Sequence, residues 1–393
     1  MSDPAPELDP EALLQRLLVR CVESDASDLH LSAGLVPYLR LEGILEPQLD
    51  DPPLSAETVE RIAGVLATAS HRDPLVKIGS LDGALTAIDG TRFRYSVFRR
   101  QNEFAISLRR LEDRFRSLAD LGMPESLYQL CDLPDGLVVV AGPTGAGKST
   151  TLATLVDRIN RTRRCHLVTI EDPIEYLHRP LESLVNQRQV GTDTESFYEA
   201  LVAAMRQDPD VILVGEIRDL PTIRTAITAA ETGHLVLTTV HAGDCVGAVE
   251  RLISVFPADE QQGMRRQLAM VLKAIVTQHL IVADGPADRP PAEVDGVVAR
   301  RPRVVTSEVL MSNPAVANLI AVGKSSQIYS TMEAGGSLGM QTLEQDLARL
   351  LDAGRISEST AMTLSRNPNV MRERSGRLRQ SRIGGARMQG GRV

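Results

Sequence analysis

The residues most plainly suited to chemistry run from Gly142 to Ser149 and read Gly-Pro-Thr-Gly-Ala-Gly-Lys-Ser. They fit the pattern GxxxxGK[ST], in which glycines let the backbone curl so that successive N–H groups point at phosphate oxygens. The apolar run Leu137–Ala141 precedes the loop, and a stretch with helical spacing follows it. This order of strand, loop and helix predicts a binding site for a nucleoside triphosphate. The alternative is a glycine-rich turn without a ligand.

The predicted cofactor-binding residues are Gly142, Pro143, Thr144, Gly145, Ala146, Gly147, Lys148, Ser149 and Thr150. In such loops the lysine bridges the outer phosphates, which is the role expected of Lys148. The hydroxyl of Ser149 is the corresponding ligand for Mg²⁺. The helix N-terminus adds a positive dipole end to the same place.

Two acidic positions follow apolar runs in this part of the chain. Glu216 ends the run that begins at Val211, and it is the candidate for activating the attacking water, since hydrolysis needs a carboxylate for that step. Gly215 stands where many phosphate-loop enzymes place an aspartate. Glu171 follows Leu167–Ile170 and is a candidate to hold Mg²⁺ through waters. The alternative for both is a solvated acid at a strand end.

Two histidines, His234 and His241, bracket the apolar run Leu235–Val240. A polar strand end beside the phosphate loop could sense the γ-phosphate. A structural role is the alternative, because an isolated histidine is more often structural.

Composition narrows the class of protein. The 393 residues include 43% hydrophobic and 24% charged residues, which is typical of a soluble globular chain of two or three domains. The net charge of −8 and the scarcity of aromatic residues argue against a protein that coats nucleic acid, so no nucleic-acid partner is expected. The four cysteines form no CxxC pair, and the sequence has no run of 18 apolar residues. A cytoplasmic protein without a transmembrane span is therefore expected.

The pattern changes along the chain. Residues 1–112 mix helical and alternating segments, which predicts a small α+β domain with strands near Thr91–Phe98 and Phe104–Leu108. The charged segment 113–118 is the expected linker. Residues 119–367 are the expected ATPase domain, a parallel α/β sheet with strands at Leu137–Ala141, Leu167–Ile170, Val211–Val214 and Leu235–Val240.

The end of the chain is expected to be mostly helical beyond Asp259. One helical face is predicted from Met264, Leu268, Val271, Leu272, Ile275 and Val276, and a later helix begins at Thr342 in a capping-box pattern with Gln345. Residues 284–303 are expected to be an inserted loop. Residues 368–393 are expected to form a flexible, arginine-rich tail.

Taken together, these motifs resemble the secretion ATPase superfamily of type II secretion and type IV pili, and within it the PilT- and PilU-like retraction ATPases. The resemblance covers about residues 25–355. It rests on the phosphate loop and on these further segments: Ser27–Leu31, Thr169–Glu175, Asn186–Gly191, Arg206–Asp219, Ala230–His234 and Gly339–Leu343.

The resemblance implies an N-terminal PAS-like domain, a C-terminal RecA-like domain, ATP and Mg²⁺ as cofactors, and a homo-hexamer. It implies that Glu216 is the catalytic glutamate, that Glu171 lies in the acidic box, and that His234 and His241 form the histidine box. It also implies arginines from the N-terminal domain, for which Arg94 and Arg109 are the candidates. An inner-membrane pilus platform protein and a paralogous pilus ATPase are the implied partners, at the inner face of the membrane.

One departure from the family's sequence motifs leaves two possible functions open. The retraction ATPases carry an Ala-Ile-Arg motif, whereas this chain has Ala317 in place of the arginine. The first is a motor for pilus retraction, that is, for twitching motility. The second is an accessory or regulatory subunit that needs a partner ATPase. The absence of a tetracysteine zinc motif favours the retraction branch over the extension and secretion branches.

Overall fold

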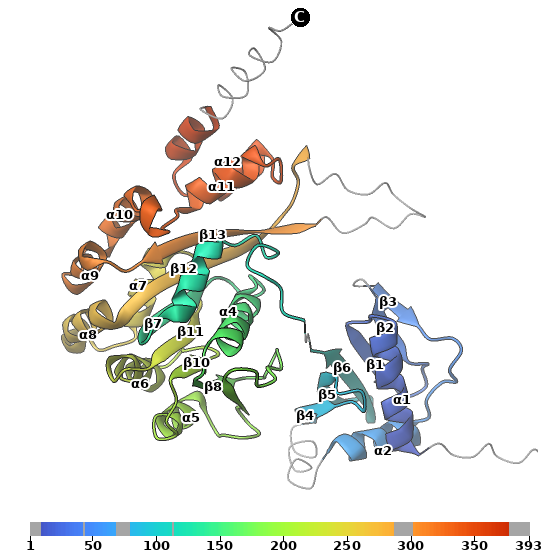
Figure 1. Ribbon diagram of the computed structural model, residues 1–393. Coiled ribbons are helices and arrows are strands. Elements are labelled where there is room, and N and C mark those ends of the chain that lie inside the picture. The colour runs from blue at the N-terminus through green and yellow to red at the C-terminus, as the bar shows by residue number, and fades with distance from the viewer. Residues whose placement is uncertain (1–8, 42–43, 68–78, 112–113, 287–301, 377–393) are drawn as a thin grey trace, which may run out of the picture. The chain divides into compact units, whose positions relative to one another are not determined.

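The computed structural model describes residues 9–41, 44–67, 79–111, 114–286 and 302–376. The chain divides into two units, and each is described here by itself. The first comprises residues 1–114 with 175–177, and the second comprises 115–174 with 178–393 (Figure 1). Residues 115–118 of the expected linker belong to the second unit. Most of the expected loop 284–303 and of the arginine-rich tail lies outside the described residues.

The first unit is an antiparallel sheet with two helices on one face. Its described strands are ordered β3-β2-β1-β6-β5-β4. Leucines of α1 and apolar residues of α2 pack on the inward-facing residues of the strands, among them Phe93 and Leu108. The elements are α1 (Pro10–Glu23), β1 (Asp28–Ser32), β2 (Tyr38–Leu41), β3 (Ile44–Pro47), α2 (Ala56–Leu66), β4 (Ser80–Thr86), β5 (Arg92–Arg100) and β6 (Glu103–Arg110).

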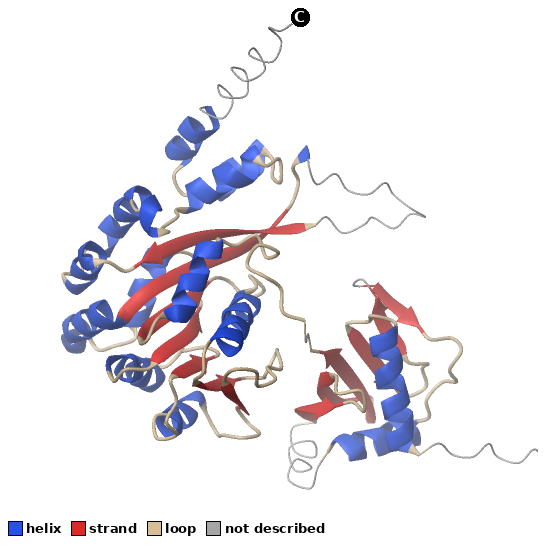
Figure 2. Cartoon of the chain, viewed as in Figure 1, coloured by secondary structure: helices blue, strands red, loops and turns tan. Residues whose placement is uncertain are grey.

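The second unit is a mainly parallel sheet covered on both faces by helices (Figure 2). Its described strands are ordered β13-β12-β7-β11-β10-β8-β9, and only the edge strand β13 runs antiparallel to its neighbour. The strands are β7 (Gly136–Ala141), β8 (His166–Glu171), β9 (Leu184–Gln189), β10 (Val211–Val214), β11 (Leu235–Val240), β12 (Leu272–Val282) and β13 (Arg303–Met311).

Alternation along the central strand explains the two covered faces. Leu137, Val139 and Ala141 of β7 join the core beneath α5 to α10, whereas Val138 and Val140 join the core beneath α4 and the 3-10 helix η1. The helical elements are η1 (Glu125–Asp132), α4 (Lys148–Thr162), α5 (Phe197–Ala204), α6 (Leu220–Glu231), α7 (Cys245–Ser254), α8 (Ala258–Val271), α9 (Pro314–Ala321), η3 (Ser325–Gln327), α10 (Ile328–Ala334), η4 (Gly336–Leu338), α11 (Leu343–Asp352) and α12 (Glu358–Leu364).

The four strands predicted for the second unit are confirmed, and so is the capping box of Thr342 and Gln345 at the start of α11. The prediction of one helical face through Val276 is wrong. Helix α8 ends at Val271, and the chain then forms β12. Leu272, Ile275 and Val276 continue the helical spacing, but the branched residues of this run pair with β7 on one side and β13 on the other.

The C-terminal segment also differs from the expectation of a flexible tail. Residues 368–376 are helical, and Met371 is fully buried there in a small apolar cluster with residues of α11 and α12. Arg374 pairs with Glu333 at 3.0 Å. The helix therefore belongs to the folded part of the second unit. Ala317, the departure from the family motif, lies half-buried on α9 against the core.

Candidate active site

The phosphate loop joins β7 to α4, as its sequence predicts. Gly147 has φ +88° just before the first turn of α4, and Gly142 has φ +149° directly after β7. A Cβ at position 142 would lie 2.4 Å from the carbonyl oxygen of Gln278 on β12. Only glycine fits this close approach of two backbones.

Lys148 begins α4 and bends back over the loop. Its Nζ donates hydrogen bonds of 3.0 Å to the carbonyl oxygens of Gly142 and Pro143. Ser149 follows on the same turn and is exposed. The loop therefore offers a cation, a hydroxyl and the N-terminal amides of a helix at one place, which is the donor set that phosphate oxygens need.

Gln278 of β12 stabilises the phosphate loop, although no sequence pattern indicates a role for it. Its Nε2 donates to the carbonyl oxygen of Ala146 at 2.6 Å, and its Oε1 accepts from the hydroxyl of Thr151 at 2.9 Å. Gln278 is 1% exposed, so both bonds are shielded from water. Because the partners are more than 120 residues apart in sequence, no local pattern could have revealed this contact.

Glu216 follows β10, two strands away from β7 at the same edge of the sheet. The backbone before it is fixed by its neighbours, because Gly215 N–H donates to Ile170 O at 2.8 Å and the Thr239 hydroxyl donates to Gly215 O at 2.7 Å. The phosphate loop and the Glu216 carboxylate therefore both lie at the carboxyl-terminal ends of parallel strands, where such sheets bind their ligands.

Two cationic or potentially cationic groups approach the same oxygen of Glu216. Its Oε2 lies 2.7 Å from Nη2 of Arg218 and 3.7 Å from Nε2 of His241. Burial and then the charge of Lys148 lower the pKa of His241, against the opposing effect of Glu216. At neutral pH the imidazole is therefore uncharged and able to accept a proton. The structure therefore brings Glu216 and His241 together.

Glu171 ends β8, the strand beyond β10. Its Oε1 accepts hydrogen bonds from the Thr169 hydroxyl at 2.7 Å and from Gln187 Nε2 at 3.1 Å. These bonds orient the Glu171 carboxylate at the carboxyl-terminal end of β8, the same end of the sheet at which the phosphate loop lies.

His234 lies at the amino-terminal end of β11, at the opposite end of the strands from the phosphate loop. It precedes β11, whereas His241 follows it, so a strand of six residues, about 20 Å, separates the two. His234 Nδ1 lies 2.8 Å from Ala229 O and 3.2 Å from the Thr232 hydroxyl, both near the end of α6. The structure does not bring His234 together with the phosphate loop of its own sheet.

Arg94 and Arg109 belong to the first unit, where they face each other across β5 and β6. Arg94 is exposed. Arg109 Nε lies 2.8 Å from Oδ1 of the buried Asp28, which also pairs with Arg40 at 3.4 Å. Asp28 thus orients Arg109. Asp28 lies in the segment Ser27–Leu31 that carries part of the family resemblance, but no sequence pattern indicated this role for it.

Among the described residues, no three His, Cys, Asp or Glu side chains form a group that could hold a metal ion by themselves. Mg²⁺ does not need such a group, because proteins hold it through one or two oxygen ligands together with the phosphates of a substrate. The exposed hydroxyl of Ser149 beside the phosphate loop, and the oriented carboxylate of Glu171, are oxygen donors of that kind.

No helix in the described part of the chain is both long and apolar enough to cross a membrane.

Comparison with known proteins shows the family to which the chain belongs. The model of the family described as "Type II/IV secretion system protein" matches residues 11–331. The chain is 39% identical over 355 residues to the type IV pilus retraction ATPase PilT of Pseudomonas aeruginosa, covering 90% of this chain and 98% of the relative. It is 36% identical over 359 residues to the type IV pilus ATPase PilU of the same organism, covering 91% and 90%.

Solved structures show the same fold. A crystal structure of the pilus retraction motor PilT with bound ADP is similar with a TM-score of 0.81 at 38% identity, covering 92% of this chain and 98% of that one. The ATPase DotB of Legionella pneumophila has a TM-score of 0.76 at 22% identity, covering 93% and 98%, and supports the fold alone. The chain belongs to the type II/IV secretion system protein family, and within it to the PilT- and PilU-like secretion ATPases that bind nucleotide.

Proposed function

We propose that this protein is a Mg²⁺-dependent ATPase that powers retraction of a type IV pilus, acting as a homo-hexamer. The observation that carries the proposal is the pairing of Glu216 with His241 at the edge of the sheet that bears the phosphate loop. The similarity to PilT over nine-tenths of the chain supports the biological role.

In the proposed reaction Glu216 takes the proton of the attacking water or orients that water toward the γ-phosphate. Lys148 leaves the carbonyl oxygens of Gly142 and Pro143 to bind the outer phosphates. Mg²⁺, when bound, neutralises developing charge on the phosphates. Ser149 and Glu171 would hold it, Ser149 directly and Glu171 through water.

The uncharged His241 would share the proton that Glu216 accepts, since its Nε2 lies beside the carboxylate. Arg94 and Arg109 are proposed to offset charge at the γ-phosphate. We further propose that the site acts at the cytoplasmic face of the membrane, with a pilus platform protein and a PilU-like paralogue as partners. The catalytic role that the family resemblance implies for His234 stays a prediction, whereas its ring contacts with Ala229 and Thr232 favour a structural role.

The biological role is tested in the organism that carries this chain. Replacing the gene by the Glu216→Gln variant should abolish twitching while pili remain extended and become more numerous. A matched Glu199→Gln variant on the exposed start of α5 should twitch normally. Fewer pili in the Glu216→Gln strain would indicate an extension motor and would contradict retraction.

A further inference from the structure

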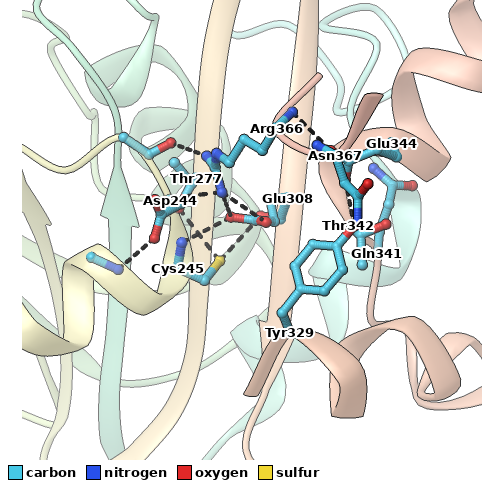
Figure 3. A network of polar contacts seen from close by, with 12 residues as sticks. Asp244, Cys245, Thr277, Glu308, Tyr329, Gln341, Thr342, Glu344, Arg366 and Asn367 are labelled. Atoms are coloured by element: carbon cyan, nitrogen blue, oxygen red, sulfur yellow. Dashed lines mark hydrogen bonds and ion pairs between the residues drawn. The ribbon is translucent and has the colours of Figure 1, made fainter. Parts of the chain in front are cut away.

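A carboxylate is buried deep inside the second unit, away from the phosphate loop. Glu308 on β13 is 2% exposed, and burial raises its pKa despite the nearby charge of Arg366. Its Oε2 accepts the backbone N–H of Cys245 at 2.8 Å. The guanidinium Nη1 of Arg366 lies 3.2 and 3.3 Å from its two oxygens. Figure 3 shows this network.

The same guanidinium also reaches the segment that follows His241. Arg366 Nη2 donates to the carbonyl oxygen of Gly243, and Nη1 lies 3.5 Å from Asp244 Oδ2. Asp244 in turn caps α7 by accepting from the N–H of Gly247. His279 Nε2 lies 3.0 Å from the Gly243 carbonyl oxygen as a further contact. Arg366 therefore connects Glu308 on β13 with Gly243 and Asp244, which follow His241 in the chain.

The position of Arg366 is itself set by a second buried carboxylate. Glu344 on α11 is fully buried, and its Oε1 accepts the backbone N–H groups of Arg366 and Asn367 at 2.9 Å each. Its other oxygen accepts the hydroxyl of Tyr329 at 2.5 Å. The Glu344 carboxylate thus fixes the backbone of the turn that carries Arg366 (Figure 3), and the helix over residues 368–376 follows this turn.

Contacts therefore run from the C-terminal turn to Gly243 and Asp244, and the backbone connects these residues to His241 of the candidate catalytic pair. Glu344 holds the backbone of Arg366, the Arg366 side chain holds Gly243 and Asp244, and these follow His241, which faces Glu216. A displacement of about 1 Å in a catalytic group can lower a rate about a hundredfold.

We propose that Arg366 is a positioning residue that aligns His241 with Glu216, so that docking of the C-terminal segment 365–376 sets the rate of ATP hydrolysis. The inference rests on the proposed ATPase function. We expect Arg366 to affect the hydrolytic step rather than nucleotide binding, because its contacts with other described residues do not include the phosphate loop.

The test compares the full-length protein with its Arg366→Met, Arg366→Lys and Arg372→Met variants in steady-state Mg-ATPase assays. Arg366→Met should lower kcat about tenfold or more, with KM for ATP changed less than about threefold. Arg366→Lys should restore part of kcat, since an ammonium can still donate to the Gly243 carbonyl. Arg372→Met is the matched control, because the exposed Arg372 side chain bonds Asn369 of its own helix rather than a residue on which the segment docks.

A double variant separates positioning from charge neutralisation. If Arg366 serves only to neutralise Glu308, adding Glu308→Gln to Arg366→Met should restore kcat; if it positions Gly243, the double variant should stay slow. This variant also lacks the unpaired buried charge that could unfold the single one. Restored kcat in the double variant, or a kcat within twofold of wild type in Arg366→Met, would overturn the proposal, as would an effect on KM alone.

A second readout distinguishes failure of this inference from failure of the proposed function. Amide hydrogen exchange at Gly243–Cys245 should be faster in Arg366→Met than in wild type and unchanged in Arg372→Met. If wild type proves unable to hydrolyse ATP, the proposed function fails, and this exchange measurement still decides whether Arg366 holds the segment. Unchanged exchange would overturn the inference.

Discussion

The side-chain amide of Gln278 donates a hydrogen bond of 2.6 Å to the carbonyl oxygen of Ala146 inside the phosphate loop. The contact joins β12 to the loop that follows its neighbour β7. The adjacent residue His279 contacts Gly243, so one strand braces both the phosphate loop and the segment after His241. The shape of the candidate site therefore depends on a strand that carries none of the predicted catalytic residues.

Replacing Gln278 by leucine should weaken nucleotide binding. The change leaves the Ala146 carbonyl oxygen and the Thr151 hydroxyl without these partners in a buried place, which costs about 1–3 kcal/mol of stability. We expect the Kd for ATP to rise about tenfold, measured by titration with a fluorescent nucleotide. Gln262→Leu is the control, since its amide bonds an exposed carbonyl, that of Ala321. Equal affinities for ATP in the two variants would contradict the stabilisation of the phosphate loop by Gln278.

Replacing Gly142 by alanine should destabilise the protein by about 2 kcal/mol or more in urea unfolding. The new Cβ would lie 2.4 Å from a backbone oxygen, at a φ that other residues rarely adopt. Gly145→Ala shares the unfavourable φ but has no atom within 4 Å of the added Cβ, so it should cost only about 1 kcal/mol. A loss at position 142 no larger than at position 145 would show that the close approach to β12 does not constrain the loop.

Those parts of the fold and site whose signals are local could be predicted from the sequence. The phosphate loop and Glu216 each follow an apolar run that forms a strand at its predicted place. Strand β12 was missed because Leu272 and Ile275 extend the spacing of the helix before them, and only pairing with β7 and β13 decides the conformation. Gln278 and Arg366 were missed for a related reason, since their partners are distant in sequence.

The two histidines of the predicted pair should behave differently. His241→Gln should lower kcat about tenfold or more, because it removes the imidazole beside the Glu216 carboxylate. His234→Gln should change kcat less than about threefold and act mainly on stability, since its ring contacts Ala229 and Thr232 at the far end of β11. Steady-state ATPase assays with parallel thermal unfolding distinguish these effects. A larger loss of kcat in His234→Gln would show that this residue acts on the reaction.

His178 should make the protein less stable in acid. Burial lowers its pKa to about 4 in the folded state, whereas the unfolded chain protonates near 6.5. The unfolded state therefore binds the extra proton first as the pH falls. Stability should drop between pH 6.5 and about 4, by about 3 kcal/mol at most.

His178→Phe isolates this effect, because it preserves the stacking on Phe115 and removes the titrating group. The free energy of unfolding, measured by urea titration at pH 7 and pH 5, should fall less in the variant than in wild type. Parallel decreases in the two proteins would show that His178 does not contribute.

The most direct test of the account is the Mg-ATPase rate measured against protein concentration for wild type and Glu216→Gln. A motor that works as a ring should show a specific rate that rises steeply with concentration. Glu216→Gln should lower that rate about a hundredfold or more while ATP still binds. A flat rate near zero in both proteins, with ATP bound, would contradict an autonomous motor and favour an accessory subunit that needs a partner ATPase.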